Sequence, residues 1–351
     1  MIARVAIDSV ALLDFKGEPR RAANTHSGII EVLDEYGYLD LLGARDAGAL
    51  FDAIQELNPD LRNLWSQALQ DLHTLNRLHV GDRQAAMSDL CIADDLPIEL
   101  GSLLDLVVVR ESLASLRGIP AGTGFARRAT EPELSLPDSV RRSSTIKCLR
   151  RQRVRGSFAK GESRETVWRE VLARPAALSK SATILDRYFL TDLLASKGTP
   201  NRDHHAWLLR NLSQAMQQGS SICVLSELPV IDKRAAGQPP RMAAKDAERI
   251  LRRALGPLVG KGNINECHII LAPWPPRWED GPHNRHIRFS CGVALCASEG
   301  LDYLDRSQLL SPFTWQAATS ADWIGELSLA EQVIRRAKRR FELSLHGEPA
   351  V

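Results

Sequence analysis

Residues 281–306, GPHNRHIRFSCGVALCASEGLDYLDR, decide which fold the second half of this chain is expected to adopt. The stretch places two histidines, His283 and His286, and three arginines beside a strand-like alternation, and it continues through Gly-Leu-Asp. Charged and titratable groups that gather at the end of a strand are typical of functional sites. The alternative is a solvated hairpin whose histidines and arginines only cap strand ends.

A second stretch, residues 183–190 (TILDRYFL), ends a short apolar run on charged and aromatic residues and precedes a helical segment. The chain carries four short motifs in this half: Asp186-Arg187-Tyr188, Asn211-Leu212, His283 with Arg285, and Gly300-Leu301-Asp302. Together they resemble the C-terminal domain found after the microtubule-interacting-and-trafficking module, which has a phospholipase-D-like fold. Arg187 stands where that family has proline, and Asn284 where it has aspartate.

The resemblance implies a phospholipase-D-like mixed sheet flanked by helices over residues 138–351. It also implies a non-catalytic binding or scaffold domain, because the family is a binding version of the fold. In that case Asp186 is expected to pair with Arg285 or Arg187. The residues expected to form the binding pocket are Asp186, Arg187, Tyr188, His286, Arg288 and Asp302.

Catalysis by the same region is the alternative, with His283 and Arg285 as the catalytic residues of a nuclease or phosphodiesterase. Active phospholipase-D enzymes use His-x-Lys, in which histidine attacks phosphorus and lysine holds the phosphate oxygens. His283-Asn284-Arg285 and His286-Ile287-Arg288 keep that spacing with arginine for lysine, but Ser290 or apolar residues stand where the downstream aspartate belongs. The incomplete machinery favours binding.

The whole chain predicts an α/β protein of two domains. It has 351 residues, 44% hydrophobic and 25% charged, with a net charge of +2, which is ordinary for a globular protein. Its six scattered cysteines favour a reducing compartment. We expect no signal peptide and no membrane span, and therefore a cytoplasmic location.

The first domain is predicted over residues 1–125. Residues 3–13 read as a buried strand, residues 27–42 as a helix, further helices begin near Asp46 and Asn58, and residues 104–110 form the next strand. Residues 118–137, rich in glycine and proline, are the expected linker. The last helix is expected over residues 328–345.

The first half also resembles metal-dependent nuclease folds of the PIN type, because an acidic residue follows the first strand. Two-metal phosphodiester chemistry needs converging carboxylates, and the candidates are Asp8, Glu31, Asp89 and Asp105. The alternative is that Asp8 caps the turn that follows its strand.

A basic segment follows the predicted linker. Alternating arginines in KCLRRQRVRGSF would place several guanidinium groups on one strand face, which suits phosphates. The predicted polyanion contacts are Arg150, Arg151, Arg153 and Arg155. The alternative is a solvated edge strand protected by its charges.

We expect no metal and no cofactor. Cys267, His268, His283, His286, Cys291 and Cys296 crowd into one region, but their spacings are not those of common structural zinc sites. The expected partners are other proteins of a prokaryotic multi-gene system, of the defence or mobile-element kind that chains of this organisation resemble. Nucleic acid or a phosphate-bearing molecule is the expected ligand.

Overall fold

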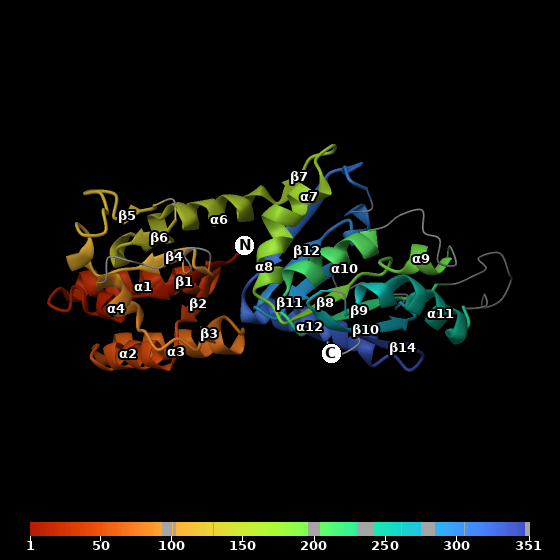
Figure 1. The fold of residues 1–351 in the computed structure, drawn as a ribbon, viewed down its shortest axis with the longest axis horizontal. Coiled ribbons are helices and arrows are strands. Elements are labelled where there is room, and N and C mark those ends of the chain that lie inside the picture. The colour runs from red at the N-terminus through yellow and green to blue at the C-terminus, as the bar shows by residue number, and fades with distance from the viewer. Residues whose placement is uncertain are drawn as a thin grey trace. The chain divides into compact units, whose positions relative to one another are not determined.

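The computed structural model describes residues 1–92, 100, 103–128, 130–195, 204–229, 242–260, 262–274, 285–304 and 306–347. The chain forms two compact units (Figure 1), one of Met1–Val154 and Thr319–Ala321, the other of Arg155–Ala318 and Asp322–Val351. Each unit has its own sheet with helices around it, so the predicted α/β class is confirmed. None of the described helices combines the length and apolarity needed to cross a membrane.

The first unit is built on a six-stranded sheet in the order β3-β2-β1-β4-β6-β5. All neighbours pair in parallel except β5 and β6. Its elements are β1 (Ala3–Ile7), η1 (Ser9–Leu13), α1 (Pro19–Tyr36), β2 (Gly37–Leu41), α2 (Ala44–Gln55), α3 (Pro59–Thr74), β3 (Leu78–Val80), α4 (Met87–Ile92), β4 (Leu106–Val108), η2 (Glu111–Leu113), β5 (Phe125–Ala126), β6 (Glu133–Ser135), η3 (Pro137–Arg142) and α6 (Ser144–Arg155).

The central strands of this sheet are buried on both faces. Val5 and Ile7 of β1 pack in a core with residues of α1, α2 and α3. Ala6, between them, packs in a second core with Met87 and Cys91 of α4. Because successive strand side chains point to opposite faces, helices cover the sheet from both sides, which explains why these strands read as continuous apolar runs.

Two sequence expectations for this unit are refined by tertiary contacts. Helix α3 begins at Pro59, next to Asn58 as predicted, and the Asn58 side chain caps it, its Oδ1 accepting from the Leu61 N–H at 3.0 Å. The helix expected over residues 27–42 instead runs from Pro19 to Tyr36, where the chain turns directly into β2. A Cβ at Gly37 would lie 2.6 Å from the Leu33 Cα, so this tight turn requires glycine.

The first unit continues past the linker expected over residues 118–137. That stretch contains both β5 and β6, and β6 pairs in parallel with β4 inside the sheet. The basic segment beyond it was predicted to be a strand, which is wrong. It forms the helix α6, whose first-turn N–H groups at Ser144 and Thr145 both donate to the buried carboxylate of Glu133 at 2.6 Å.

The second unit is built on an eight-stranded mixed sheet in the order β14-β10-β9-β8-β11-β12-β13-β7. Strands β8, β9 and β10 are parallel neighbours, and the remaining pairings are antiparallel. Its elements are β7 (Ser157–Phe158), α7 (Arg164–Val167), η4 (Trp168–Leu172), α8 (Ala173–Ala177), β8 (Ser181–Leu185), α9 (Thr191–Ala195), α10 (His204–Ala215), β9 (Ser220–Glu227), α11 (Ala244–Leu255), η5 (Gly256–Leu258), β10 (Ile264–Ala272), β11 (Arg285–Phe289), β12 (Val293–Ala297), η6 (Leu301–Leu304), β13 (Phe313–Ala318), α12 (Ala321–Arg335) and β14 (Phe341–His346).

The helix expected over residues 328–345 is wrong in its second half. Helix α12 ends at Arg335, and β14 follows, pairing antiparallel with β10 along six residues. Leu343 and Leu345 are buried with exposed or half-buried neighbours, which is the alternation of a strand. Leu327 and Ile334 of α12 lie in the cores on one face of the sheet.

The strands that carry the two candidate motifs are direct neighbours (Figure 1). Strand β11 pairs antiparallel with β8, with His286 opposite Leu185 and Phe289 opposite Ala182. The prediction that both stretches belong to one sheet is therefore confirmed. The last residue of β8 and the first residues of β11 meet at one edge of the sheet.

Candidate functional site

Antiparallel register brings Asp186 and Arg285 to the same edge of the second sheet. Leu185 lies opposite His286, so the residue after β8 and the first residue of β11 face each other. The Leu301 N–H donates to Asp186 Oδ2 at 2.7 Å, which draws the Gly-Leu-Asp segment to the same place. Residues far apart in the chain therefore form one rim.

Asp186 is the buried centre of this rim. It is completely enclosed and accepts N–H bonds from Tyr188 at 2.9 Å and from Leu301 at 2.7 Å. Burial raises the pKa of Asp186 to about 6, although these two N–H groups favour its ionised form. The Asp186 carboxyl group thus positions the backbone at Tyr188 and Leu301. Its hydrogen bonds to these two N–H groups replace the expected pairing with Arg285 or Arg187.

The two arginines have other acidic partners. Arg187 binds the Glu227 carboxylate through Nε at 2.7 Å and Nη2 at 3.2 Å. Arg285 Nη1 lies 3.9 Å from Asp302 Oδ1, at the outer limit of an ion pair. Two hydrogen bonds to one carboxylate therefore fix Arg187 more firmly than the longer contact with Asp302 fixes Arg285.

Tyr188 presents an exposed aromatic ring between these arginines. Its side chain is 38% exposed. The guanidinium carbon of Arg187 lies 5.2 Å from the ring centroid, and that of Arg285 lies 5.3 Å from it. These are cation–π distances, so two guanidinium groups lie close to the ring at the solvent edge of the sheet. The arrangement is suited to an anionic group.

Gly300 permits the close approach of η6 to β11. Its φ is +109°, and an added Cβ would lie 2.4 Å from Asp302 Oδ1 and 2.6 Å from Arg285 Nη1. A side chain at this position would displace both members of the charged pair. The glycine of the Gly-Leu-Asp motif is therefore required by conformation and by space.

The second His-x-Arg copy faces the other side of the sheet. His286 is completely buried, and its Nε2 lies 3.1 Å from Glu331 Oε1 on α12. Arg288 donates to the same carboxylate through Nε at 2.8 Å and Nη2 at 2.7 Å. Burial disfavours the ionised form of Glu331, but these hydrogen bonds outweigh it and hold its pKa below the ordinary value.

The structure therefore separates the predicted site residues. Asp186, Arg187, Tyr188, Arg285 and Asp302 come together at the rim. His286 and Arg288, expected to bind a ligand, are fixed beneath α12 by Glu331. His283 lies outside the described residues.

No family model matches the chain, and no curated protein is similar to it in sequence.

Sequence reasoning missed Glu331 and Glu227, the two acids that hold the arginines. Glu331 lies on the stripe of α12 that also carries Leu327 and Ile334, all three buried. An acidic residue at that helical spacing predicts a buried charge that needs partners. Glu227 ends β9 and had no comparable signal.

The carboxylates of the nuclease alternative lie at separate places in the first unit. Asp8 follows β1 and is held by Arg110 at 2.5 and 2.8 Å, while its Oδ1 also accepts from the Val10 N–H. Asp105 precedes β4 and accepts from the Arg4 N–H at 2.7 Å. In a parallel sheet these positions are opposite edges. Glu31 pairs with Arg141, and Asp89 with Arg45.

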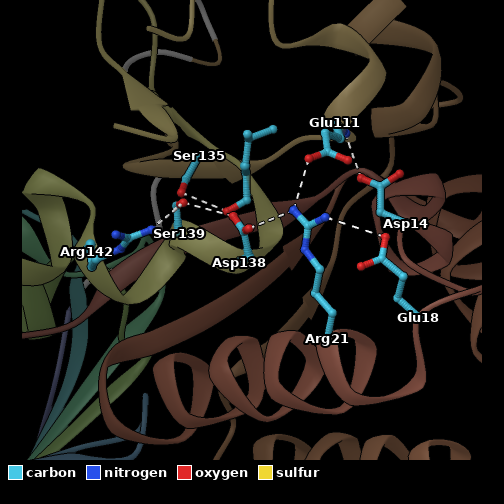
Figure 2. A network of polar contacts seen from close by, with 9 residues as sticks. Asp14, Glu18, Arg21, Glu111, Ser135, Asp138, Ser139 and Arg142 are labelled. Carbon is cyan, nitrogen blue, oxygen red and sulfur yellow. Dashed lines mark hydrogen bonds and ion pairs between the residues drawn. The ribbon is translucent and has the colours of Figure 1, made fainter. Parts of the chain in front are cut away.

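Other acids at the carboxyl edge of this sheet belong to an arginine-centred network (Figure 2). Arg21 of α1 contacts Glu18, Glu111 and Asp138, and Asp14 accepts from the Glu111 N–H at 2.6 Å. These contacts tie α1 to η2 and η3. Their role in the described structure is to connect loops that follow different strands.

In the described part of the chain, no group of three or more His, Cys, Asp or Glu side chains is arranged to hold a metal ion. The cysteines of the focal region are free and buried. Burial raises the pKa of Cys267 and Cys296 to about 12. These thiols stay protonated and pack as small apolar side chains.

Proposed function

We propose that this chain is a non-catalytic binding protein, and that its second unit is a degenerate phospholipase-D-like domain. The rim formed by Asp186, Arg187, Tyr188, Arg285 and Asp302, called the Tyr188 rim below, would hold an anionic, phosphate-bearing group of a partner. The observation that carries the proposal is the exposed Tyr188 ring flanked by the guanidinium groups of Arg187 and Arg285. The resemblance to chains of this two-part organisation further implies that the partner is another protein of the same multi-gene system.

The charges around the rim support recognition of a phosphate. Arg187 uses Nε and Nη2 for Glu227, and its remaining nitrogen is available, within the described contacts, for a ligand. Arg285 lies 3.9 Å from Asp302. An incoming phosphate oxygen can take the place of this distant carboxylate as the partner of Arg285. Guanidinium groups pair with phosphate through fixed, bidentate geometry.

The state of the second histidine supports binding over catalysis. A nucleophilic histidine needs an accessible ring nitrogen, and His286 is enclosed with Nε2 directed to Glu331. Phosphodiester cleavage would therefore depend on His283 with Arg285. Active phospholipase-D enzymes usually use two copies of the His-x-Lys motif, and neither His-x-Arg copy of this chain is followed by the downstream aspartate.

Titration of the full chain with a phosphoserine peptide tests the proposal, with the unphosphorylated peptide as reference. Arg285→Ala and Arg187→Ala should each weaken binding about 10- to 100-fold, the value of a charged hydrogen bond. Arg249→Ala, which removes an exposed arginine of α11, is the matched control and should bind normally. His283→Ala should also retain binding.

Hydrolysis of bis-p-nitrophenyl phosphate tests the alternative, that the chain is a phosphodiesterase. Wild-type cleavage that stops in His283→Ala, while peptide binding persists, would establish the phosphodiesterase and overturn the proposal. Equal affinity for both peptides would exclude the phosphate-binding rim.

A further inference from the structure

One side of helix α6 packs against the first unit. Ile146 is completely buried in the first unit's core, and Leu149 packs against that core. Arg153 lies with its Nη1 3.5 Å from Glu35 Oε2 and its guanidinium carbon 5.8 Å from the Tyr36 ring centroid. These residues show which side of α6 faces the protein.

The outward side of α6 carries a set of exposed cations. Lys147, Arg150 and Arg151 are spaced as i, i+3 and i+4, so they share one helix face. All three are exposed, and within the described chain neither Arg150 nor Arg151 has an ion-pair partner. A strand would have grouped Arg151 with Arg153 and Arg155 instead. The helix makes Arg153 structural, and the side chain of Arg155 is not described.

Strand β5 extends this surface. The Lys147 Nζ lies 5.2 Å from the Phe125 ring centroid, which places β5 next to the outward side of α6. Arg127, two residues beyond Phe125, is exposed. We define Lys147, Arg150, Arg151 and Arg127 as the α6 basic face. Because the whole chain has a net charge of only +2, these four cations are a local excess of positive charge.

We infer that the α6 basic face binds the phosphate backbone of nucleic acid. Neighbouring cations at helical i, i+3 and i+4 spacing lie about 5–6 Å apart, and a helix with such a row can contact successive phosphates. Arginine forms directed hydrogen bonds to phosphate. A membrane surface would need the apolar side of an interfacial helix, and in α6 that side is packed against the first core. This site is separate from the Tyr188 rim.

The test is binding of a fluorescent DNA duplex and a single-stranded RNA to the full chain as salt is raised from about 50 to 200 mM. Arg150→Gln/Arg151→Gln should weaken binding at low salt and reduce the log–log salt slope by about 2, one contact per arginine. The matched control is Arg252→Gln/Arg253→Gln, which removes two neighbouring exposed arginines from α11. It should keep the wild-type slope.

Circular dichroism of both double variants checks that the helices remain folded. A loss in the control equal to that in the α6 variant would overturn the inference, because any reduction of net charge would then have the same effect. It would also be overturned by a wild-type chain that binds neither probe at low salt, or that binds anionic vesicles and not nucleic acid. Comparison of the DNA and RNA arms identifies the type of nucleic acid bound.

Discussion

At the scale of single residues, the rim depends on a buried carboxyl group that positions backbone. Asp186 holds the N–H groups of Tyr188 and Leu301, and so places the aromatic ring and the Gly-Leu-Asp segment. The expected salt bridge would have given Asp186 a direct electrostatic role. Burial has changed that role, because removal from water disfavours the ionised form and raises the pKa of Asp186 even though the Arg285 charge acts in the opposite direction.

Asp186→Asn should change the pH dependence of stability. The folded state raises the pKa of Asp186 from 3.8 to about 6, so between these values it binds more protons than the unfolded chain. Wild-type stability therefore falls as pH rises through this window. Relative to Asp186→Asn, the wild type should lose up to about 3 kcal/mol between about pH 4 and pH 7.

Urea unfolding across that pH range measures the effect, with the exposed Asp246→Asn as the control for loss of a carboxylate. Parallel stability curves for wild type and Asp186→Asn would contradict the predicted shift. Asp186→Ala should be less stable than Asp186→Asn at every pH, because it leaves two backbone donors without their acceptor.

At the scale of elements, α6 shows how one distant carboxylate decides a secondary structure. Glu133 lies in β6, yet both its oxygens accept from the first turn of α6. The first N–H groups of a helix have no partner within the helix, and a negative charge there is also stabilised by the positive end of the helix dipole. This contact fixes where α6 begins and hence which arginines face outward.

Glu133→Gln should destabilise the first unit by about 2–3 kcal/mol, because a buried charged acceptor of two hydrogen bonds becomes neutral. Hydrogen exchange should show the largest loss of protection in α6. Glu56→Gln is the control, since Glu56 is an exposed acid paired with Lys16. Uniform loss of protection over the whole unit, without a greater effect in α6, would show that Glu133 does not anchor the helix.

At the scale of the whole molecule, the chain has two compact units, each with its own sheet and cores. The first contains a mostly parallel sheet covered on both faces, and the second a mixed sheet with α12 on one face. Separate cores allow the two units to differ in stability. The α6 basic face belongs to the first unit and the Tyr188 rim to the second.

Matched cavity substitutions test this division. Leu39 of β2 and Leu225 of β9 are both completely buried, in the first and second units respectively. Leu39→Ala and Leu225→Ala should each cost about 2–5 kcal/mol. Hydrogen exchange should rise in the sheet of the substituted unit and stay near wild type in the other. Equal increases in both sheets for both variants would show that the units unfold together.

The sequence by itself determined the α/β class, the buried strands and features such as the start of a helix near Asn58, because these follow from local side-chain pattern. It also grouped Asp186, Tyr188, Arg285 and Asp302 as one candidate site. Only the tertiary structure decided that Asp186 bonds to backbone, that Glu331 encloses His286, and that the segment after Ser143 is a helix. Each of these depends on a buried partner distant in the chain, and periodicity reports which face is apolar but not what will cover it.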